Sequence, residues 1–98
     1  MKPRYRTHEE YLIESLRDPK EAALYLNACV EENDPELILD ALAIIAKAHG
    51  VGKVAKKASL SRMGLYKVLS KKGNPQLKTF LGLLDASGLR MSFSPRRG

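Results

Sequence analysis

The apolar residues of the chain recur mostly with the spacing of amphipathic helices. Positions i, i+3, i+4 and i+7 of one predicted helical face are held by Ala22, Tyr25, Leu26 and Cys29. Residues 37–48 are apolar at almost every position, with Asp40 and Lys47 as exceptions. The pattern predicts an amphipathic helix in the first segment and a central, largely buried helix in the second.

Polar residues and prolines indicate where these helices begin. Thr7 and Glu10 have the spacing of a capping box, in which the Thr7 hydroxyl accepts a hydrogen bond from the Glu10 amide. Asp-Pro pairs at 18–19 and 34–35 each place a capping residue before a proline at the first helical position. Gly50 is typical of a residue that ends a helix. We therefore expect helices over about residues 8–17, 19–32 and 35–48.

Beyond Gly50 the apolar spacing predicts two short helices joined by a tight turn. The first helix has an inner face of Val51, Val54, Ala55 and Ala58, and the second has one of Leu65, Val68 and Leu69. The small Ala55 allows the second helix to approach closely, Leu60 lies in the turn, and Ser61 is a good N-cap. These features predict a helix-turn-helix over about residues 51–70.

Two residues of this motif are unusual. Ser59 occupies the turn position at which a positive φ favours glycine. Gly64 lies inside the second helix, where glycine costs about 1 kcal/mol relative to alanine. One hypothesis is that Gly64 lets the backbone lie close to a bound duplex.

The last part of the chain predicts one more helix and then a strand. Asn74 and Pro75 are expected to cap and open a helix that Gly88 closes, with a buried stripe of Leu77, Phe80, Leu81 and Leu84. After it, Leu89, Met91 and Phe93 alternate with polar residues, the pattern of a short strand with one apolar face. A lone strand cannot satisfy its own backbone, so it either pairs with its copy in a second subunit or packs on the last helix. Leu89, Met91 and Phe93 are therefore the dimerisation candidates.

The expected fold is all-α: one domain over residues 1–98, a compact bundle of about six helices with a helix-turn-helix and a short C-terminal β-strand. Flexible ends are expected at about residues 1–6 and 94–98.

Charge divides the chain into two unlike parts. The net charge is +6, but residues 1–40 hold 5 Lys or Arg against 10 Asp or Glu, while residues 41–98 hold 12 basic residues and 1 acidic one. No carboxylate occurs between Ala41 and Leu84. Because an ordinary solvated surface interleaves both signs, this distribution indicates a polyanionic partner, and nucleic acid before others.

The outward side of the second motif helix then becomes the candidate DNA-reading surface. Ser61, Arg62 and Met63 would meet base edges in the major groove, with Arg62 holding a guanine and Met63 touching a thymine methyl. Tyr66 and Lys67 would reach a base or a phosphate, and Lys53, Lys56, Lys71 and Lys72 phosphates. The complete set of DNA-binding candidates is Lys53, Ser61, Arg62, Met63, Tyr66, Lys67, Ser70 and Lys71. The alternative is a helical hairpin with solvated lysines.

Other functional classes find little support in the sequence. No apolar run approaches the roughly 18 residues of a membrane span, and no signal peptide is apparent, so a cytoplasmic protein is expected. Cys29 alone cannot form an internal disulfide, and His8 and His49 have no ligand spacing, so neither a metal nor another cofactor is expected. No residue is placed to activate a serine nucleophile, and we expect no catalytic activity.

Several segments resemble the addiction-module antidote family, the antitoxins among Xre/Cro-like helix-turn-helix proteins. The resemblance lies in residues 60–70, in Gly73-Asn74-Pro75 and in the ending Gly88-Leu89-Arg90-Met91-Ser92. Upstream, Glu10-Tyr11-Leu12, Asp18-Pro19 and Tyr25-Leu26-Asn27-Ala28 agree too, so it covers nearly the whole chain. Gly52 replaces a serine that is usual in the family at the start of the first motif helix.

The resemblance implies a type II antitoxin that neutralises a small basic toxin and, acting as a homodimeric repressor, autoregulates their shared promoter. The acidic first part of the chain could cover such a toxin, with Glu9, Glu10, Glu14, Glu31, Glu32 and Asp34 as candidate contacts. Carboxylates near helix N-termini are also common as solvated residues. The alternatives are a protein-interaction module and a phage-type repressor without a toxin partner.

Overall fold

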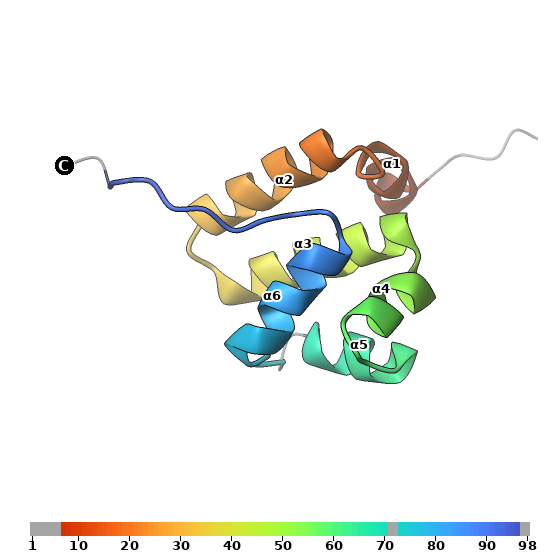
Figure 1. The fold of residues 1–98 in the computed structure, drawn as a ribbon. Coiled ribbons are helices and arrows are strands. Elements are labelled where there is room, and N and C mark those ends of the chain that lie inside the picture. The colour runs from red at the N-terminus through yellow and green to blue at the C-terminus, as the bar shows by residue number, and fades with distance from the viewer. Residues whose placement is uncertain (1–6, 71–72, 97–98) are drawn as a thin grey trace, which may run out of the picture.

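The fold was taken from a computed structural model, which describes residues 7–70 and 73–96. Its six helices follow one another in the order shown in Figure 1: α1 (His8–Ser15), α2 (Pro19–Glu31), α3 (Pro35–His49), α4 (Val51–Lys57), α5 (Arg62–Val68) and α6 (Leu77–Ala86). The number of helices agrees with the expectation from the sequence. The expected flexible ends lie partly outside the described residues, at 1–6 and 97–98.

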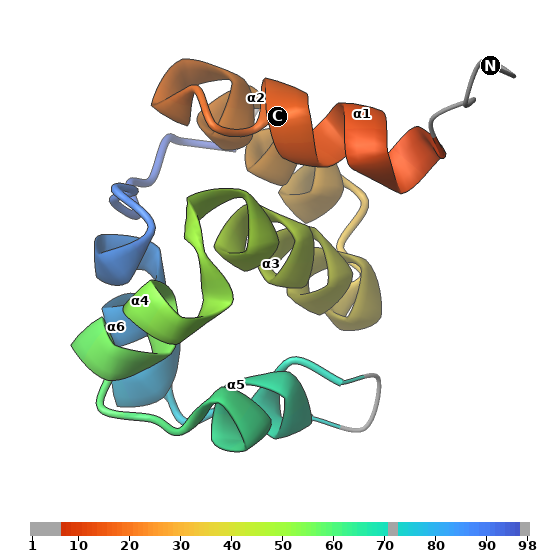
Figure 2. The same cartoon turned by 90° about the vertical axis from the view of Figure 1, so that its right-hand side faces the viewer.

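The core forms around α3, the most apolar of the longer helices. Leu42 and Ile45 of α3 are fully buried, and α1, α2 and α4 all pack against this helix. Figure 2 shows α3 between the pair α1 and α2 on one side and α4 to α6 on the other. The predicted central position of this segment is confirmed, because its apolar residues cover most of the helix circumference.

Local side-chain caps fix the first three helix starts as the sequence predicted. The Thr7 Oγ1 accepts from the Glu10 backbone N–H at 3.1 Å, and the Asp18 and Asp34 carboxylates accept from the amides two residues on, each at 3.0 Å. These bonds satisfy amide groups that a helix start leaves without partners. The helix ends differ little from the expectation, with α1 two residues shorter.

The start of α6 and two of the four residues of its expected inner face were predicted wrongly. Gln76, and not Asn74, is the N-cap residue, and it makes no side-chain cap bond. Leu77 and Leu81 are 66% and 42% exposed, whereas Leu84 is buried and Phe80 half-buried as expected. Leu83, which was not expected inside, is also buried. The reason is that α6 packs against α4, and this contact selects which of the four leucines of the helix are buried, a choice that their positions around the helix leave undecided.

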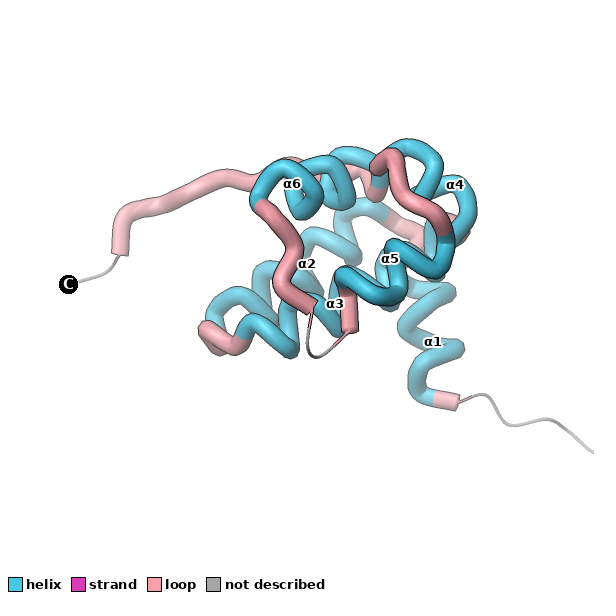
Figure 3. Tube along the Cα trace, turned by 90° about the horizontal axis from the view of Figure 1, so that it is seen from below, coloured by secondary structure: helices cyan, strands magenta, loops and turns pink. Residues whose placement is uncertain are grey.

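The expected C-terminal strand is also wrong, because no strand is present in residues 7–70 and 73–96. The chain leaves α6 through Gly88, with φ of 75°, and the Leu89 backbone N–H donates to the Leu84 carbonyl at 2.8 Å. This Schellman ending turns the chain back, and the residues after it run as a loop (Figure 3). They line a groove with α2 and α6, and no strand is present in the described residues with which their backbone could pair. None of the helices in the described part of the chain has the length and apolar content of a membrane span.

Candidate nucleic-acid interface

The turn between α4 and α5 is a Schellman motif built on a serine. Ser59 has φ of 60°, its backbone N–H donates to the Lys56 carbonyl at 3.1 Å, and the Leu60 N–H donates to the Ala55 carbonyl at 2.8 Å. Both bonds satisfy carbonyl groups at the end of α4. The positive φ expected at Ser59 is therefore confirmed, with serine in a conformation that glycine adopts more readily.

Buried side chains hold α4 and α5 together. Val54 and Leu65 have no exposed surface and Ala55 has 1%, while Leu60 and Val68 are half-buried beside them. Leu69, directly after α5, is buried as well. The two helices and their turn thus have the arrangement of a helix-turn-helix, and the small Ala55 lies in the interior as predicted.

The outward side of α5 is exposed and basic. Arg62 and Lys67 are both exposed, so neither is turned into the core. Met63 is 80% exposed and Tyr66 is 46% exposed, one helical turn apart on the same side. An exposed cation pair flanking two exposed apolar side chains can contact phosphates and base edges of a duplex.

The two predicted serine contacts already have local partners. Ser61 Oγ accepts from the Gly64 backbone N–H at 2.9 Å and so caps α5. Ser70 Oγ donates to the Lys67 carbonyl at 2.8 Å. Each hydroxyl retains capacity for two further bonds, since Ser61 can still donate once and accept once and Ser70 can still accept twice. Lys53 is exposed on α4, whereas Lys71 and Lys72 lie outside the described residues.

The acidic helices are on the side of the molecule away from α5. In both Figure 1 and Figure 2, α1 and α2 lie at the top and α5 at the bottom. Neither α4, α5 nor the turn between them contains a carboxylate. The positive potential over α4 and α5 is therefore not neutralised by residues of these helices.

The six acidic candidates do not form one continuous surface. Glu9, Glu10 and Glu14 belong to α1, whereas Glu31, Glu32 and Asp34 are at the far end of α2. Since α2 has 13 residues, the two groups are separated by roughly the 20 Å that this helix spans.

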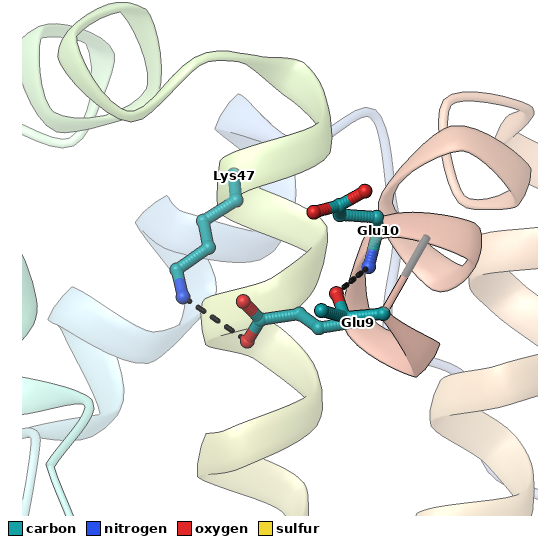
Figure 4. Close-up of polar contacts among 4 residues, drawn as sticks. Glu9, Glu10 and Lys47 are labelled. Atoms are coloured by element: carbon teal, nitrogen blue, oxygen red, sulfur yellow. Dashed lines mark hydrogen bonds and ion pairs between the residues drawn. The ribbon is translucent and has the colours of Figure 1, made fainter. Parts of the chain in front are cut away.

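The Glu9 carboxylate is engaged in an ion pair within the chain. The Lys47 Nζ lies 3.2 Å from the Glu9 Oε1, which joins the end of α3 to the start of α1 (Figure 4). Lys47 is one of the lysines of the carboxylate-free segment 41–84, and its charge is balanced by Glu9 in this pair. Sequence reasoning missed it because the partners are 38 residues apart.

The dimerisation candidates border an apolar groove that the sequence did not reveal. Leu89 is half-buried, Met91 is 37% exposed and Phe93 is 90% exposed. With α2 and α6, they line a groove of about 390 Å³. The three predicted residues thus line one groove, without the strand pairing that was expected of them.

The other chemically active side chains are placed as structural residues. Cys29 is buried, and burial, with a smaller contribution from the charge of Glu32, raises the pKa of its thiol. His8 opens α1 and His49 closes α3, so both are helix-end residues as predicted. Among residues 7–70 and 73–96, no three His, Cys, Asp or Glu side chains gather as metal ligands.

Comparison with known proteins gives a consistent family. Residues 6–95 match the family described as probable addiction module antidote protein. The chain is 40% identical over 86 residues to an uncharacterized protein of Haemophilus influenzae (strain ATCC 51907 / DSM 11121 / KW20 / Rd), covering 88% of this chain and 89% of that protein. No solved structure matches the chain significantly.

Proposed function

The chain belongs to the family of probable addiction module antidote proteins, and from this membership we propose that it is an antitoxin that also represses transcription by binding DNA. The observation on which the DNA-binding part rests is the exposed basic side of α5, held outward by the buried Leu65. In this proposal α5 enters the major groove and α4 lies across the sugar–phosphate backbone.

Each exposed residue of α5 has a role that follows from its chemistry. Arg62 is at the first position of the helix, where its planar guanidinium can donate two hydrogen bonds to a guanine. Met63 offers an apolar contact for a thymine methyl, and Tyr66 lies one turn further along. Lys67 on α5 and Lys53 on α4 contact phosphates, which fixes the register of the helix without reading bases.

The toxin partner is proposed from the family description, which names an antidote. A small basic toxin would be attracted to the acidic residues of α1 and α2, on the side away from α5. Since the carboxylates are in two groups, a toxin contacting Glu31, Glu32 and Asp34 need not contact those of α1. With separate surfaces, one antitoxin can hold its toxin and its operator together.

DNA binding is tested with the protein's own promoter fragment in a salt titration. We expect affinity to fall steeply with salt, because lysine–phosphate contacts release counterions. Arg62→Ala should lose about 1–3 kcal/mol of specific binding and relax preference at one base pair, while Lys53→Ala should weaken all sequences alike and lower the salt slope by about 1. Lys20→Ala, an exposed lysine of α2, is the matched control and should bind as the wild type does.

Two outcomes would contradict this function. One is binding that is indifferent to salt; the other is an Arg62→Ala variant that keeps full sequence preference. Tight binding of an acidic protein to the α5 side, with no DNA binding, would instead support a protein-interaction module.

A further inference from the structure

The segment that contains α4, α5 and their turn has a restricted set of polar side chains. Between Gly50 and Gly73 the chain contains no Asp, Glu, Asn or Gln, so its polar side chains are those of Lys, Arg, Ser and Tyr. In the major groove, carboxylate groups read the amino group of cytosine and carboxamide groups read adenine. Since the segment has neither group, its side chains suit bases that can be recognised by hydrogen-bond donors or by apolar contact.

The first turn of α5 offers two exposed side chains to a base pair. Arg62 and Met63 are the first two residues of the helix, and both are exposed. Gly64 has no side chain, and Leu65 is fully buried. The Ser61 hydroxyl, just before the helix, is held by its cap bond to the Gly64 backbone N–H. Because the N-terminal residues of a recognition helix meet the base edges, Arg62 and Met63 dominate what α5 can read there.

Met63 is suited to detect a methyl group but not the polar atom beside it. Its side chain is 80% exposed, so the core of the chain makes little use of it. A thioether is only a weak acceptor and has no donor, so Met63 cannot distinguish the O4 acceptor of thymine from the N4 donor of cytosine. The methyl group on C5 of thymine is within its chemistry, because it offers apolar contact. The same methyl group is present in 5-methylcytosine and absent from cytosine and uracil.

Arg62 determines where such a methyl group would lie. Its guanidinium can donate two hydrogen bonds to O6 and N7 of a guanine, and Met63 follows it directly in the same helical turn. We therefore propose that α5 reads a guanine beside a pyrimidine that carries a C5 methyl group, and that 5-methylcytosine can replace thymine at this position. This rests on the proposed DNA binding and adds a form of regulation to it, since methylation of a cytosine at this position would strengthen repression.

Promoter duplexes that differ at one base test this with the full chain. The guanine is first identified as the base pair at which Arg62→Ala loses preference. The pyrimidine of a neighbouring base pair is then thymine, uracil, cytosine or 5-methylcytosine, and each of the two neighbouring base pairs is tested. In anisotropy titrations at one salt concentration, uracil should bind about fourfold more weakly than thymine, and cytosine about fourfold more weakly than 5-methylcytosine. This is the factor expected for burial of one methyl group.

Three variants assign the effect to Met63. Met63→Ala should bind the methylated and unmethylated duplexes alike while keeping its preference for the guanine, and its fold should be unaffected because Met63 is exposed. Met63→Leu keeps the apolar surface and should keep the fourfold difference. Lys53→Ala is the matched control, which should weaken binding to all four duplexes by the same factor, because a phosphate contact does not sense the base.

The proposal is overturned if the wild type binds the thymine and uracil duplexes equally at both positions, or if cytosine methylation does not strengthen binding. A methyl preference that persists in Met63→Ala would also overturn it, because another residue would then read the methyl group. In each of these cases, affinity that falls steeply with salt would leave the DNA-binding function standing. Failure to bind any promoter duplex at low salt would remove both.

Discussion

The Oγ atom of Ser61 accepts a hydrogen bond from the backbone N–H of Gly64 at 2.9 Å, and this bond fixes the first turn of α5. A Cβ atom added to Gly64 would lie 3.0 Å from the same oxygen. The Ser61 cap and the substitution of Gly64 are thus coupled, because both involve the same hydroxyl oxygen.

Ser61→Ala removes the cap. We expect the free energy of unfolding to fall by about 1 kcal/mol, because an amide at the start of α5 loses its partner. Thermal denaturation should show a decrease in Tm of about 5 °C. Ser94→Ala, in the exposed C-terminal segment, is the control and should leave Tm unchanged. An equal Tm for both variants would mean that the cap contributes nothing.

Gly64→Ala should stabilise the protein less than a typical glycine-to-alanine change in a helix. The helical gain is about 1 kcal/mol, but the new methyl group crowds the Ser61 hydroxyl. In the Ser61→Ala background the hydroxyl that crowds the new methyl group is absent. Gly64→Ala should then stabilise the protein by the full amount expected in a helix. A double-mutant cycle in urea measures this coupling. An equal change in unfolding free energy in both backgrounds would contradict the coupling. Separately, the promoter affinity of Gly64→Ala tests whether the backbone at Gly64 lies against DNA.

Ser59 and Gly88 occupy the same position of two Schellman motifs, with φ of 60° and 75°. Replacing them in opposite directions should shift stability in opposite directions. Ser59→Gly should stabilise by about 0.5 kcal/mol, since relief of the left-handed conformation exceeds the added freedom of the unfolded chain. Gly88→Ala should destabilise by about 1 kcal/mol. Urea denaturation measures both, and shifts of the same sign would exclude this explanation.

The buried thiol of Cys29 predicts a loss of stability at alkaline pH. Burial first, and the charge of Glu32 second, raise its pKa above the ordinary value of 9.0. The folded chain therefore keeps a proton that the unfolded chain releases, so this contribution is present below pH 9.0 and is lost as pH rises further.

Between neutral pH and a pH about one unit above the ordinary thiol pKa, the unfolding free energy of Cys29→Ala should decrease less than that of the wild type. Urea denaturation at the two pH values measures this decrease for each protein. A loss of packing in the variant lowers its stability equally at both pH values and so does not affect the comparison. A wild type whose decrease matches that of the variant would refute the assignment to Cys29.

The sequence predicted those parts of the fold that depend on neighbours in the chain. Thr7, Asp18, Asp34 and Ser61 each bond to an amide two or three residues away, so their spacing alone indicated where four helices begin. The small Ala55 and the turn at Ser59 indicated the helix-turn-helix for the same reason. The family was likewise recognisable from short runs of residues, and the match over residues 6–95 confirms it.

Only the tertiary structure decided which surfaces meet. The alternation of Leu89, Met91 and Phe93 suited a strand, but a strand forms only where a partner backbone is available, and the described residues offer none beside this segment. Leu77 and Leu81 were expected inside together with Leu84, yet the packing of α6 on α4 leaves these two exposed and buries Leu83 beside Leu84. The pairing of Glu9 with Lys47 and the separation of the acidic residues into two groups depend equally on how distant helices cross. Local sequence fixes the bonds a segment makes with itself, whereas burial is settled by competition among all segments for the same core.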